Sequence, residues 1–125
     1  MYKVGVFCVV IFMSNWTHVA GIIRIDDLDR CLGDKVENLD FEKLIQLPRG
    51  SEGPLDMTVW VNPDEHRLDG YTVSIFGDLR DHDSADEIID WFKETCAKFD
   101  DDVRQAVITA ENELFGTKNF VYERK

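Results

Sequence analysis

Cysteine, proline and glycine are all scarce in this sequence, and each shortage excludes a class of protein. The chain of 125 residues contains 3 cysteines, Cys8, Cys31 and Cys96, an odd number without C-x-x-C spacing. Neither a disulfide framework nor a zinc site is therefore expected, and a reducing, cytoplasmic compartment fits best. With 3 prolines and 8 glycines, collagen and low-complexity chains are excluded, while 44% hydrophobic residues suffice to bury a core.

Positive charge is also in short supply. The chain has 14 Lys and Arg against 25 Asp and Glu, which gives a formal net charge of −11. Nucleic acids and anionic membranes are bound through basic residues that contact phosphates, so neither is expected as a partner. All of the net negative charge lies between residues 26 and 102, and this placement favours a basic protein as the partner.

Sequence motifs for catalysis are missing as well. The chain has no G-x-S-x-G, no P-loop and no G-x-G-x-x-G, and no cysteine has Lys, Arg or His neighbours arranged to lower its pKa. Cys96 lies on an apolar helical stripe and is expected in the core. We therefore predict no catalytic residue, no cofactor and no metal site.

An apolar stretch begins the chain. Lys3 is followed by ten apolar residues, 4–13, which are too few to span a bilayer. Three interpretations stay open: a weak signal-like segment, a start codon placed too early with Met13 as the true start, or a buried strand. We therefore separate residues 1–15 from a single predicted domain at 16–125.

Alternating apolar residues predict several strands. Residues 16–26 place Val19, Ile23 and Ile25 on one face. Residues 55–61 and 71–76 alternate in the same way and are separated by a turn-rich loop, so they are expected to form a hairpin. A further strand is expected over 103–110, and 115–122 supplies one more strand or a docked tail.

Two helices are predicted between these strands. The first covers about 34–46 and is ended by Pro48, after which residues 48–54 read as a loop. The second begins with the capping box Ser84 to Glu87. It continues to about residue 99 with an apolar stripe at spacings of four and three, formed by Ala85, Ile89, Phe92, Cys96 and Phe99.

The order strand, helix, strand, strand, helix, strand predicts the fold class. It is an α+β two-layer sandwich, ferredoxin-like β-α-β-β-α-β, with an antiparallel sheet and room for an extra strand at each end. Many unrelated functions occur on this architecture, so the fold alone assigns none.

Two surfaces are candidates for binding a partner. The first is an acidic row on the second helix, formed by Asp83, Glu87, Asp90 and Glu94 at spacings of four, three and four. One interpretation is a solvated face. The other is docking on a basic, nucleic-acid-binding protein, as an accessory or inhibitor protein of a mobile element would do by imitating a row of phosphates.

The second candidate surface is the sheet face without helices. Trp60 and Phe76 are expected there, together with Trp16. Exposed aromatic residues on this face favour a homodimer, and the alternative is that residues 4–12 or the C-terminal tail cover them.

A cluster at Asp81-His82-Asp83 supports the rival function. Carboxylates beside an imidazole before a helix are typical of acid/base or metal sites, although acidic residues here also complement the helix dipole. The sequence thus predicts a small acidic protein–protein interaction domain that is not an enzyme. The alternative is a small-molecule-binding or metal-binding, enzyme-like domain that uses this cluster.

Overall fold

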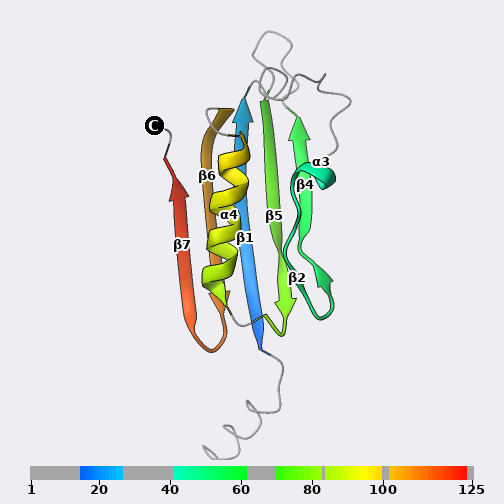
Figure 1. Ribbon diagram of the computed structural model, residues 1–125, viewed down its shortest axis with the longest axis vertical. Coiled ribbons are helices and arrows are strands. Elements are labelled where there is room, and N and C mark those ends of the chain that lie inside the picture. Colours follow the sequence, from blue (N-terminus) through cyan, green and yellow to red (C-terminus); the bar gives the residue numbers. More distant parts are fainter. Residues whose placement is uncertain (1–14, 27–40, 62–69, 83, 100–101, 124–125) are drawn as a thin grey trace, which may run out of the picture.

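The fold is built on one antiparallel sheet in which every strand runs opposite to its neighbours (Figure 1). The computed structural model describes residues 15–26, 41–61, 70–82, 84–99 and 102–123. Across the sheet the five strands are ordered β4 (Asp56–Val61), β5 (Gly70–Arg80), β1 (Trp16–Asp26), β6 (Val103–Asn112) and β7 (Gly116–Tyr122). The first described strand, β1, is therefore the central strand of this sheet, paired with β5 on one side and β6 on the other.

The strand predictions are confirmed by this pairing. Residues 16–26 form β1 with the expected bounds, and β4 and β5 form the expected hairpin, with Val59 opposite Val73. The segment 115–122 supplies β7, a fifth strand that pairs with β6.

One long helix, α4 (Ala85–Phe99), lies across one face of the sheet (Figure 1). It packs on β6 and β7 and reaches β1. All five residues of its predicted apolar stripe are buried, as expected for an amphipathic helix on a sheet. At its start the backbone N–H of Glu87 donates to the Ser84 hydroxyl at 3.2 Å, which confirms this half of the capping box.

The expected ferredoxin-like β-α-β-β-α-β sandwich with two helices is wrong. In the described part of the chain α4 is the single long helix. The helix predicted over 34–46 appears only as one turn, α3 (Phe41–Leu44), and residues 34–40 lie outside the described ranges. The chain after α3 instead packs against α4, where the Nε1–H of Trp91 donates to the carbonyl of Gln46 at 2.7 Å.

Irregular chain after α3 helps to cover the β5 side of the core. Ile45 and Leu55 are buried, and the Phe41 ring lies 5.4 Å from that of Tyr71 on β5, measured between centroids. Ile45 belongs to the pattern that had suggested a helix, but it is buried just after the single turn of α3.

The predicted loop at 48–54 contains a small second sheet, β2 (Arg49–Gly50) paired with β3 (Gly53–Pro54). It is held to the end of β5, where the N–H of Ser51 donates to the carbonyl of Arg80 at 2.8 Å. A Cβ on Gly50 would come 2.5 Å from that same carbonyl oxygen, so only glycine permits this approach.

Phe92 is the test of the core between α4 and the sheet. It is fully buried, and its ring meets the edge of Phe120 on β7 at 6.3 Å between centroids. We expect Phe92→Ala to lower the free energy of unfolding by about 3–5 kcal/mol, because it leaves a cavity in this core. Urea denaturation measures the loss. Phe115→Ala is the matched control, since Phe115 is 73% exposed and its loss should change stability by less than about 0.5 kcal/mol.

Candidate functional site

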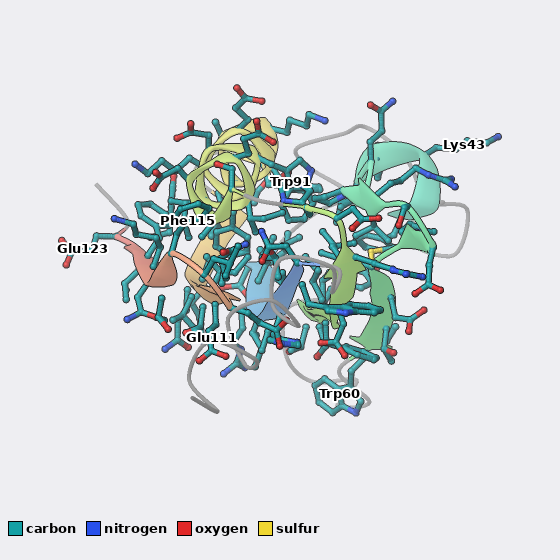
Figure 2. All side chains as sticks on the ribbon, turned by 90° about the horizontal axis from the view of Figure 1, so that it is seen from below. Lys43, Trp60, Trp91, Glu111, Phe115 and Glu123 are labelled. Atoms are coloured by element: carbon teal, nitrogen blue, oxygen red, sulfur yellow. The ribbon has the colours of Figure 1, made fainter. Side chains whose placement is uncertain are left out.

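The face of the sheet opposite α4 is the candidate site, and we call it the open face. Figure 2 shows Trp60 and Glu111 pointing to this side, away from the helix. Five large apolar side chains are exposed there: Val107 by 39%, Ile22 by 42%, Phe76 by 44%, Trp60 by 53% and Val121 by 59%. The predicted placement of Trp60 and Phe76 on one sheet face is therefore what the structure describes.

The strand register arranges the open face in rows that cross the sheet. One row contains Ile22, with Ser74 opposite it on β5 and Val107 opposite it on β6. The row before it contains Ala20, with Phe76 on β5 and Thr109 on β6. These two rows line a shallow, mostly apolar hollow of about 330 Å³ at the centre of the face.

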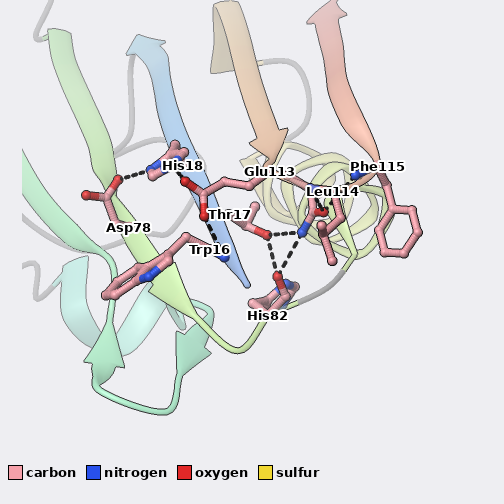
Figure 3. A network of polar contacts seen from close by, with 9 residues as sticks. Trp16, Thr17, His18, Asp78, His82, Glu113, Leu114 and Phe115 are labelled. Atoms are coloured by element: carbon pink, nitrogen blue, oxygen red, sulfur yellow. Dashed lines mark hydrogen bonds and ion pairs between the residues drawn. The ribbon is translucent and has the colours of Figure 1, made fainter. Parts of the chain in front are cut away.

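Charged side chains mark one end of the open face. His18 Nδ1 lies 2.7 Å from Asp78 Oδ1, and His18 Nε2 lies 3.2 Å from Glu113 Oε2 (Figure 3). Glu111 is opposite His18 on β6, in the same row. One imidazole therefore lies within reach of two carboxylates, beside a third, and we call this group the acidic end.

The two carboxylates favour the charged form of the imidazole. The hydrogen bond with Asp78 raises the pKa of His18 most, followed by that with Glu113, and together they outweigh the opposing effect of desolvation. A pKa that is raised in the folded state contributes stability fully below the ordinary value of about 6.5. That contribution is lost as the pH rises through the higher, folded-state pKa.

We expect a titration of His18 by NMR to give a pKa above the ordinary value. Asp78→Asn should lower that pKa more than Glu113→Gln does, because the Asp78 hydrogen bond has the larger effect. Glu111→Gln is the control, since this carboxylate shares the row without a recorded hydrogen bond to the ring, and it should have the smallest effect. An unchanged pKa in both Asp78→Asn and Glu113→Gln would contradict the described contacts.

A second polar network lies behind the acidic end, on the helix side of the sheet. Asn112 is buried, and its Nδ2 donates to the Thr17 hydroxyl at 3.0 Å and to the carbonyl of His82 at 3.1 Å. Its Oδ1 accepts from the backbone N–H groups of Leu114 and Phe115, both at 3.0 Å (Figure 3). One amide thus ties the β6–β7 turn, the central strand and the chain before α4 together.

We expect Asn112→Ala to cost about 1–3 kcal/mol of unfolding free energy, because it leaves buried backbone groups without their partner. The control is Asn119→Ala on β7, an exposed amide that accepts from Thr109 at 2.9 Å. Denaturant melts of the two variants should separate clearly. Equal stability would show that water replaces the Asn112 bonds without cost.

The acidic row predicted on the second helix is only partly described. Glu87, Asp90 and Glu94 are exposed on α4, whereas Asp83 lies outside the described residues. No described cation lies within 4 Å of Asp90 or Glu94, and Lys93 reaches across to the Phe120 ring, 5.0 Å from its centroid. Asp90 and Glu94 are therefore exposed without a described cation beside them, and the described part of the row carries no apolar centre.

Of the predicted cluster Asp81-His82-Asp83, the structure describes Asp81 and His82, whereas Asp83 lies outside the described residues. The Asp81 carboxylate is exposed and accepts from the Ser51 hydroxyl at 2.9 Å. The His82 side chain is only 14% exposed, and its Nε2 lies 3.6 Å from Glu87 Oε2. Within the described ranges, no group of three or more His, Cys, Asp and Glu side chains is placed to hold a metal ion.

Cys96 behaves as a core residue. Burial raises the pKa of its thiol to about 12, so the nucleophilic thiolate is strongly disfavoured. This result agrees with its predicted position on the apolar stripe. Cys8 and Cys31 lie outside the described residues.

Sequence reasoning missed the acidic end and the Asn112 network. The alternation along residues 16–26 leaves His18 on the face opposite Val19, but it does not show which side chains lie beside it. Asp78 is 60 residues away and Glu113 is 95 residues away along the chain. The signal that finds them is the strand register, which puts His18 and Asp78 side by side.

Comparison with known proteins assigns no family to this chain. No protein-family model matches it, and no curated protein or solved structure matches it either. Among the residues that the structure describes, no helix has both the length and the apolar character needed to cross a membrane. The geometry of the open face is thus the basis for a functional proposal.

Proposed function

We propose that this protein is a protein–protein interaction domain without catalytic chemistry of its own, and that it binds its partner through the open face. The observation that carries the proposal is the apolar centre of that face. Ile22, Phe76 and Val107 stand around the central hollow, and no described segment covers them. A contiguous apolar patch on an otherwise charged protein is typical of an interaction surface.

The acidic end makes the two ends of this surface different, so it can fix the orientation of a bound partner. Asp78, Glu111 and Glu113 surround the single imidazole of His18, so the group is negative overall even when His18 is protonated. Charges at the rim of an interface select the partner and its orientation more than they add affinity. The partner is therefore expected to carry an apolar surface with a basic residue opposite the acidic end.

The acidic row on α4 is the weaker candidate for binding a basic protein. Asp90 and Glu94 in this row lack described ion-pair partners, which supports docking by long-range attraction. However, an interface usually has an apolar core within its polar rim, and the row has none. For this reason we place the binding surface on the sheet.

Site-specific photo-cross-linking in the native cells tests the proposal. A photoreactive residue replaces Thr72, which lies on the open face beside Trp60 on β4. The matched control places the same residue at Ala97, which is exposed on α4. We expect a discrete cross-linked product from position 72 and none from position 97.

The specificity of that product depends on the apolar patch. Adding Phe76→Asp should abolish the cross-link at position 72 while the variant still melts cooperatively. Cross-linking that is equal at the two positions, or that survives Phe76→Asp, would contradict a binding surface on the open face.

A further inference from the structure

We infer that the occupant of the open face is a second copy of this chain, packed face to face as a two-fold symmetric dimer. This inference rests on the proposed function and names its partner. Three features of the described residues support a copy of the same surface: the alternation of large and small side chains, the charges at the two ends, and the area available.

Large and small residues alternate between the two central rows on each of three strands. On β1 the pair is Ile22 and Ala20, on β5 it is Phe76 and Ser74, and on β6 it is Val107 and Thr109. A two-fold axis that lies between the two facing sheets, parallel to both and directed across the strands midway between these rows, would set each row against the other row of the second copy. Every large apolar side chain would then face a small one, as close packing requires.

The central hollow provides the space for this arrangement. Its floor includes Gly21 and its walls include Ile22, Phe76 and Val107. It lies over the small residues Ala20 and Ser74, which are the positions that the large side chains of the second copy would meet. The hollow of one copy and the large side chains of the other copy that would fill it therefore belong to the same two rows.

The charges on the open face complement each other under the same symmetry. The axis passes over the row of Gly21, which is midway along β1 between His18 and Arg24. Arg24 of each copy would therefore stand over His18 and its carboxylates in the other copy, within reach of Glu111. Among the described residues, no carboxylate forms an ion pair with Arg24 inside its own chain.

The area of the face allows a specific but reversible dimer. Strands about 4.8 Å apart and residues about 3.3 Å apart give the surface between the rows of His18 and Arg24 an area of about 500 Å². Two such surfaces bury about 1,000 Å², which is at the lower limit for specific protein interfaces. Interfaces of this size are typical of reversible, transient contacts, so monomer and dimer are expected to interconvert.

Sedimentation velocity of the full chain over a wide concentration range, at physiological ionic strength, tests the dimer. Salt at this level screens the repulsion between two copies that each carry a net charge of −11. We expect the parent protein to shift from monomer to dimer as its concentration rises. Phe76→Asp should remain monomeric, whereas Ala97→Asp, the same introduced charge on the outer surface of α4, should dimerise like the parent.

A charge exchange tests the orientation without touching the apolar patch. Arg24→Glu should weaken the dimer at least tenfold, because it places a carboxylate over the acidic end of the other copy. Adding Glu111→Arg to the same chain should restore most of the affinity, since symmetry brings positions 24 and 111 of different copies together. Neither side chain is buried, and thermal melts confirm that each variant folds.

Three results would overturn the inference: a parent that stays monomeric throughout, a dimer that survives Phe76→Asp, or a double variant no tighter than Arg24→Glu alone. A monomeric parent that still cross-links from position 72 to a different protein would remove the second copy and keep the interaction surface. A monomeric parent without that cross-link would remove both.

Discussion

The pairing of β1 with a strand on each side is the constraint on which the rest of this structure depends. Its register sends Ile23 and Ile25 toward α4 and sends His18, Ile22 and Arg24 to the open face. Because side chains alternate with a period of two, a slip of one residue would exchange these two sets. The core and the candidate binding surface are therefore fixed by the same ladder of hydrogen bonds.

Local patterns in the sequence predicted the strands and the helix that are determined by neighbouring residues in the chain. Alternation gave the bounds of β1, and the four-and-three spacing with Ser84 at its start gave α4. The apolar residues near Ile45 suggested a second helix because the same residues suit a helix or an irregular buried segment. The choice between them depends on contacts with β5, such as the close approach of Gly50 to Arg80, which no local pattern contains.

In the candidate site, too, some residues could be placed from local patterns and others could not. Trp60 and Phe76 could be placed on one sheet face from alternation alone, because period two is visible along each strand. The partners of His18 could not, since they depend on which strands are neighbours and in which register. The same reason explains Asn112, whose buried amide contacts Thr17 from 95 residues away. At one end of β1, carboxylates therefore bind His18 on the open face, and the Asn112 amide binds Thr17 on the helix side.

The lengths of the strands affect whether the sheets of different molecules can join into fibres. The edge strands β4 and β7 have 6 and 7 residues, whereas the inner strands β1 and β5 have 11. Short edge strands offer few free backbone groups to another chain, which discourages sheets from joining side by side into fibres. A face that pairs with itself about a two-fold axis also closes after two members. In the dimer that we propose, growth of a larger polymer would be opposed both in the plane of the sheet and across it.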